Sequence, residues 1–158
     1  MLSEDKKIIP LLANTNYGGG VDMDSFKGYG KSVTVIMLFG AVTGNAVLTV
    51  NSGATAGTKT STMPFRIANG GGAIGAASAD VLSAWTASNA SSQATLTGAT
   101  FTTKMGILEI PLSGADTANN EEWITISISN AASSGILYAA AVVDCPRYTG
   151  NRSTTLLA

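Results

Sequence analysis

Few side chains in this sequence could carry out chemistry near neutral pH. The chain has no histidine, one cysteine and 12% charged residues, so the commonest general acid–base group is missing. The thiol of Cys145 has no histidine to activate it, and the preceding Asp144 disfavours its thiolate. Glu121 and Glu122 are adjacent, so on a strand they point to opposite faces and cannot act together as a glycosidase pair. The sequence predicts a protein that is not an enzyme.

Two further motifs resemble parts of ligand sites but lack the rest of the pattern. Gly30-Lys31-Ser32 resembles the end of a phosphate-binding loop, yet Ser25 stands where that loop needs glycine, and the segment runs into a strand. Asp22 and Asp24 alternate as oxygen ligands of Ca²⁺ do, but no Gly or Glu follows at EF-hand spacing. We therefore expect no catalytic residue, no cofactor and no metal ion.

The composition favours a protein that associates with other proteins. Hydrophobic residues make up 45% of the chain, and the mean hydropathy is +0.26. A soluble surface usually carries about 25–35% charged residues, so an isolated monomer would risk exposing apolar patches. The alternative is that small Ala, Gly, Ser and Thr residues simply dilute the charge.

The net charge and the N-terminal residues bear on possible partners, and the cysteine content bears on the compartment of synthesis. The net charge of −1 and pI of about 5.2 provide no basic field for a nucleic acid. The N-terminal residues match neither a signal peptide nor a membrane span. The single cysteine fits synthesis in a reducing cytoplasm. We expect neither nucleic acid nor membrane as a partner.

Alternating apolar residues predict a series of strands connected by turns. Residues 31–39 are apolar enough for a central strand covered on both faces, and they form a hairpin with 45–50. Residues 123–129 alternate almost without exception and form a second hairpin with 135–143. Residues 73–90 could hold a short helix or a loop. Further β-rich stretches are 58–67, with Pro64 at an edge or bulge, 93–97 and 104–112.

These strands predict an all-β fold, an antiparallel β-sandwich that is jelly-roll-like. The sandwich core is expected at residues 31–144, between an N-terminal arm at 1–30 and a C-terminal arm at 145–158. Both arms are expected to contact neighbouring subunits, because Arg and Tyr are favoured interface anchors and the apolar residues lie outside the strand pattern. The residues expected at that interface are Ile8, Ile9, Leu11, Leu12, Pro146, Arg147, Tyr148 and Arg152.

Trp85 and Trp123 are the candidates for a ligand site, since exposed indole rings can stack on sugars. Trp123 falls on the polar face of its predicted strand. The competing interpretation is that each ring is covered by an arm, a loop or a neighbouring subunit, where tryptophan is enriched.

Several stretches of the sequence resemble small virion proteins of tailed bacteriophages. They are DMD at 22–24, GYGKSVTV at 28–35, GNAVLTV at 44–50, ATAGT at 54–58, EWITISISN at 122–130 and DCPRY at 144–148. The resemblance implies a non-enzymatic capsid decoration, or cement, protein that binds the outside of the head and stabilises the shell. Its implied partners are the major capsid protein and further copies of itself, as a trimer or dimer.

The implied location is the capsid exterior of the virion, after synthesis in the host cytoplasm. The alternative function is a carbohydrate-binding β-sandwich module on a tail or head fibre, with Trp85 or Trp123 stacking on the sugar.

Overall fold

The computed structural model describes residues 6–28, 30–115 and 117–144, and its ten strands form one antiparallel sheet. The strands are β1 (Lys6–Asn16), β2 (Val21–Asp22), β3 (Phe26–Lys27), β4 (Ser32–Gly53), β5 (Ser61–Thr62), β6 (Arg66–Asn69), β7 (Thr86–Ala87), β8 (Gln93–Thr97), β9 (Met105–Pro111) and β10 (Trp123–Asp144). The helical elements are α1 (Gly98–Phe101) and the 3-10 turns η1 (Leu112–Gly114) and η2 (Thr117–Asn119).

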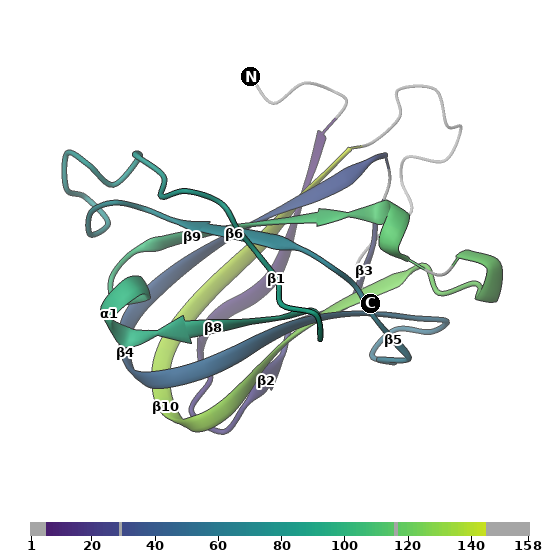
Figure 1. The fold of residues 1–158 in the computed structure, drawn as a ribbon, viewed down its shortest axis with the longest axis horizontal. Coiled ribbons are helices and arrows are strands. Elements are labelled where there is room, and N and C mark those ends of the chain that lie inside the picture. The colour runs from purple at the N-terminus through teal and green to yellow at the C-terminus, as the bar shows by residue number, and fades with distance from the viewer. Residues whose placement is uncertain (1–5, 29, 116, 145–158) are drawn as a thin grey trace.

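Two strands of 22 residues, β4 and β10, run through both layers of the molecule. They pair with each other from Trp123 opposite Gly53 to Val142 opposite Thr34. Figure 1 shows both strands curving, so that one half of each lies in each layer. Strands β1, β9, β6 and β7 extend one layer, and β2, β3, β5 and β8 extend the other. The expected all-β, sandwich-like fold is confirmed, with the two layers formed by halves of one folded sheet.

The two predicted hairpins are wrong. Residues 31–39 and 45–50 belong to the continuous strand β4, while 123–129 and 135–143 belong to β10. Gly44 has a φ of 73°, and the β4–β10 register shifts between Ala131 and Leu137. Glycine and bulges bend a strand as well as end one. The turn-prone residues therefore mark a bend in each long strand and not a reversal of the chain.

The predicted N-terminal arm is also wrong for residues 6–28. Strand β1 pairs with β10 at one edge of its layer, and the side chains of Ile9 and Leu11 are buried in the core. Pro10 is compatible with this position because an edge strand leaves one side of its backbone unpaired. Ile9 and Leu11 are consequently not available to a neighbouring subunit. The predicted C-terminal arm at 145–158 lies outside the described residues.

Of the two alternatives for residues 73–90, the loop is correct. This segment contains only the short strand β7 and an isolated bridge between Gly70 and Leu82.

The core lies between the layers and is filled by alternate residues of the long strands. These include Val33, Val35, Met37, Phe39, Leu48 and Val50 of β4 and Ile124, Ile126, Ile128 and Leu137 of β10. At the bend, the short helix α1 lies beside β4 (Figure 1), and Phe101 packs against Phe39 with ring centroids 5.2 Å apart. This aromatic pair fills the end of the core near the bend.

Tyr17 follows β1 and is fully buried against β10. Its backbone N–H donates to the carbonyl of Gly135 at 3.0 Å, and the ring lies directly against this glycine. The buried phenol oxygen has no hydrogen-bond partner among the described residues. Burial raises the pKa of this phenol above 10.0. The ring is therefore held by packing, and its hydroxyl contributes a desolvation cost.

We expect Tyr17→Phe to keep or raise the stability of the fold. Removing an unpaired buried hydroxyl recovers up to about 1–3 kcal/mol of desolvation free energy. Since the folded-state pKa is the higher one, the wild type should lose stability as the pH rises above the unfolded pKa of about 10, and the variant should lose less. Urea unfolding at neutral and alkaline pH measures both effects. A clear loss of stability in the variant at neutral pH would contradict this account.

Candidate interaction surface

The two outer faces of the sandwich differ in chemistry. The outward residues of the layer with β2, β3, β5 and β8 are mostly polar and include Asn45, Thr49, Asn51, Gln93, Thr95, Thr97, Ser127 and Ser129. The other layer turns apolar residues outward, and we call this set the apolar face. It consists of Ile8, Pro10, Ile36, Leu38, Met105, Ile107, Ile136, Tyr138, Ala140 and Val142.

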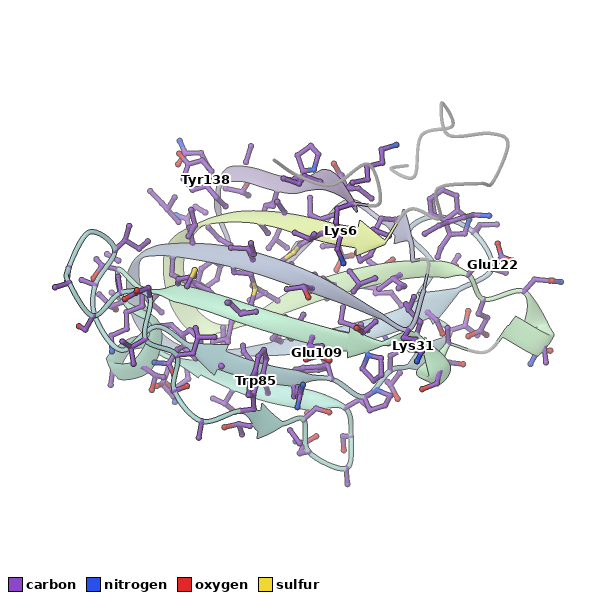
Figure 2. The ribbon with its side chains drawn as sticks, turned by 90° about the horizontal axis from the view of Figure 1, so that it is seen from above. Lys6, Lys31, Trp85, Glu109, Glu122 and Tyr138 are labelled. Atoms are coloured by element: carbon purple, nitrogen blue, oxygen red, sulfur yellow. The ribbon has the colours of Figure 1, made fainter. Side chains whose placement is uncertain are left out.

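The pairing register places these residues in rows across the sheet. Ile36 of β4 lies opposite Ala140 of β10 on one side and opposite Ile107 of β9 on the other. In the next row, Leu38 lies between Tyr138 and Met105. Directly opposite residues of paired strands point to the same side, so the rows form one continuous surface. Figure 2 looks onto this face, with Tyr138 labelled on it.

Large apolar side chains on this face remain open to solvent. The exposed fractions are 39% for Leu38, 45% for Ile136, 46% for Tyr138 and 49% for Ile8. A continuously apolar strand is normally covered on both faces, as the sequence of residues 31–39 predicts. In the structure, one face of this part of β4 packs into the core of the sandwich. The other face has no layer packed on it within the described residues. The apolar face is the strongest candidate for an interaction surface.

An ion pair borders the apolar rows on one side. The Nε and Nη2 atoms of Arg66 on β6 donate to Glu109 Oε2 on β9 at 2.9 and 2.6 Å. The Arg66 guanidinium also lies 4.7 Å from the ring centroid of Trp85. Trp85 and Glu109 lie on the side of the layer seen in Figure 2. These two charges therefore neutralise each other beside the apolar rows.

Trp85 and Trp123 lie on opposite outer faces of the sandwich. Trp123 is on the polar face, where Lys27 Nζ lies 5.2 Å from its ring centroid and 2.8 Å from Glu122 Oε2. Each indole ring thus has a cation over one side, at the distance of a cation–π contact. The two rings cannot form one sugar-binding platform, and each can offer a sugar only its other side.

We expect Arg66→Ala to make Trp85 more accessible without unfolding the protein. Measured in a Trp123→Phe background, acrylamide quenching of Trp85 fluorescence should increase, because the guanidinium no longer covers the ring. The unfolding free energy should change by less than about 1 kcal/mol, since the ion pair is exposed. Lys59→Ala removes another exposed ion pair, with Asp22 on the polar face, and should leave the quenching unchanged. Equal quenching in both variants would contradict the observed stacking.

The polar face holds a shallow depression of about 450 Å³ around Asp22 and Lys59. Lys59 Nζ donates to both carboxylate oxygens of Asp22 at 2.9 Å. Burial by itself raises the pKa of the Asp22 carboxyl, but the neighbouring Ser127 hydroxyl and the Lys59 ammonium outweigh it and lower this pKa. The ionised carboxylate of Asp22 is therefore stabilised by its ion pair with Lys59.

A larger groove of about 790 Å³ lies at the end of the sandwich away from the bend. Its charged lining residues are Lys27, Lys31 and Glu122, and its apolar lining residues include Leu112 and Ile124. Within the part of the chain that the structure describes, no group of three or more His, Cys, Asp or Glu residues could hold a metal ion. No helix there is both long and apolar enough to span a membrane.

The residues expected at an interface fall into four groups. Ile8 lies on the apolar face and is exposed, and Leu12 is partly buried against the core. Ile9 and Leu11 are core residues, as described above. The remaining four, Pro146, Arg147, Tyr148 and Arg152, lie outside the described residues, so their role stays a prediction.

Sequence reasoning missed the centre of the apolar face. Ile36 and Leu38 belong to a strand expected to be covered on both sides, and Tyr138 to one expected as the partner in a hairpin. The signal that could have found them is the excess of apolar residues on both sides of a predicted strand. A scan against protein-family models and searches of the curated proteins and the solved structures found no match to the chain.

Proposed function

We propose that this chain is a non-enzymatic structural protein of a tailed-bacteriophage virion. It acts as a capsid decoration protein that binds the outer surface of the head and stabilises the shell. The observation that carries the proposal is the apolar face, an exposed surface built from central strands of the sheet. The sequence resemblance to small phage virion proteins supports the proposal that the assembly is a phage head.

The apolar face favours a protein that works inside a larger assembly. Monomeric soluble proteins rarely expose continuous apolar patches larger than a few hundred Å². Four strands at a spacing of about 4.8 Å and some six residues at about 3.3 Å each give a projected area near 400 Å² before side-chain relief is added. Leaving such a surface in water is costly, at about 25 cal/mol per Å² of apolar area. Association with protein removes that cost.

The edges of the sheet disfavour pairing with strands of other chains. Contacts with other proteins are therefore expected on the faces of the sheet. At one edge, β1 contains Pro10 and two irregularities in its pairing with β10. At the other end of the strand order, β7 has only two residues. Proline, bulges and short strands are features that protect sheet edges from pairing with other chains. The proposed assembly therefore uses side-chain surfaces.

Contacts with the shell are assigned in this proposal to the C-terminal residues 145–158. Arg147, Tyr148 and Arg152 are of the types that anchor interfaces, and Pro146 precedes them in the sequence. Weak contacts with the shell act together when subunits are joined to each other, because binding of one subunit raises the effective concentration of the subunit joined to it.

Binding to isolated heads tests the proposal. Heads that lack this protein are mixed with the purified chain, and co-sedimentation and the temperature of head disruption are measured. Saturable binding and a higher disruption temperature are expected. A chain shortened by residues 145–158 should stay folded by circular dichroism but bind more weakly. Absence of binding by the full chain, combined with binding to oligosaccharides, would support the fibre-module alternative instead.

A further inference from the structure

We propose that the apolar face binds the apolar face of a second copy of this chain, so that the working unit is a symmetric dimer. The inference rests on the proposed function and deepens it, because it names the partner of the surface that carries that proposal. In the dimer, two sandwiches stack with their β1–β10–β4–β9 surfaces against each other.

The chemistry of the face fits a second copy better than an unrelated protein. Homodimer interfaces are more apolar than other interfaces, whereas contacts between different proteins depend on complementary charge for their specificity. The two central rows, around Ile36 and around Leu38, are apolar throughout β10, β4 and β9. The adjoining charges, Arg66 and Glu109, already bind each other. In a symmetric dimer, the two copies of this ion pair therefore do not bring unpaired charges of the same sign face to face.

The layout of the face matches the usual anatomy of an interface. The apolar rows are bordered by Thr34 and by the Arg66–Glu109 pair, and the exposed Lys6 is the first residue of the edge strand β1. Figure 2 shows Lys6 and Glu109 on this side of the molecule, away from Tyr138. A stable interface commonly has an apolar centre and a polar rim. Tyr138 adds an exposed aromatic side chain of the type that anchors binding.

The area is sufficient for a specific contact. With a projected area near 400 Å² on each copy, and more once the corrugation of side chains is included, a face-to-face dimer buries on the order of 1,000 Å² in total. This value lies near the lower end of specific interfaces. Sheets of this kind pack about 10 Å apart with their side chains interdigitated.

Sedimentation equilibrium tests the dimer directly. The wild-type chain should have twice the 16.0 kDa mass of one chain. The double variant Leu38→Glu with Tyr138→Glu places four carboxylates in the interface of a dimer and should have the mass of one chain. The matched control, Thr95→Glu with Ser129→Glu, alters two exposed residues of the polar face and should remain dimeric. Circular dichroism of all three proteins establishes that they are folded.

The outcomes separate this inference from the proposed function. A wild-type chain that stays monomeric at high concentration, forms a trimer, or dimerises equally well in the apolar-face variant overturns the inference. A second outcome is that the wild type is monomeric and binds heads, as the control variant does, while the apolar-face variant does not bind. In that case the apolar face contacts the shell, and the proposed function stands without the dimer. If the dimer forms and is broken by the variant but does not bind heads, the inference stands and the proposed function fails.

Discussion

Replacing Phe39 with alanine should lower the free energy of unfolding by about 3–5 kcal/mol, the range for aromatic truncations in a core. Phe39 is 1% exposed and packs against Phe101 of α1 at the bend of β4. Gly106 on the neighbouring strand lies close to the same ring. Truncation leaves a cavity between groups held by three elements of the fold, which cannot close fully around it. Urea unfolding followed by circular dichroism measures the loss.

The control for Phe39→Ala is Val81→Ala, which truncates an apolar side chain that is 60% exposed in the 73–90 loop. Its effect should stay within about 0.5 kcal/mol, as for most surface substitutions. Losses of similar size in the two variants would contradict the placement of Phe39 in the core.

Gly135→Ala should destabilise the protein by about 1–3 kcal/mol, the usual cost of adding volume to a packed interior. A Cβ atom at this position would lie 2.5 Å from the hydroxyl oxygen of Tyr17 and 2.7 Å from its Cζ atom. The ring cannot move aside easily, since it is fully buried and the backbones of the two residues are joined by a hydrogen bond. Thermal and urea unfolding both report the change.

Gly19→Ala is the matched control, because a Cβ atom there has no other atom within 4 Å. It should leave stability nearly unchanged. Combining Gly135→Ala with Tyr17→Phe should recover only part of the loss, since the Cζ contact at 2.7 Å remains when the hydroxyl is removed. Equal stability of the Gly135 and Gly19 variants would show that the Tyr17 ring does not occupy the described position.

The sequence was sufficient for local features of the fold but not for the path of the long strands. The alternation of residues 123–129 correctly places Ile124, Ile126 and Ile128 in the core. A glycine such as Gly44 is compatible with a hairpin and with a bend. The choice between them depends on which distant strand pairs with each half, and here β4 and β10 pair along almost their whole length. Local composition does not contain that information.

That the chain exposes apolar surface could be predicted from the sequence, but the position of this surface could not. The low charge and high hydropathy predict exposed apolar side chains. Locating this surface requires knowing which side of each strand the chain itself covers. Strand β1 was not predicted because it contains Pro10 and pairs irregularly with β10. In this strand Ile9 points into the core, whereas Ile8 faces outward. Only the assembled sheet separates these two neighbours.

The number of copies of this chain per major capsid protein in purified virions tests the central claim most directly. Quantitative mass spectrometry of intact particles gives this ratio. If the chain is a decoration protein on the head, we expect many copies, near parity with the shell protein. A few copies per particle would place the chain at a tail or vertex, and its complete absence from virions would contradict the account.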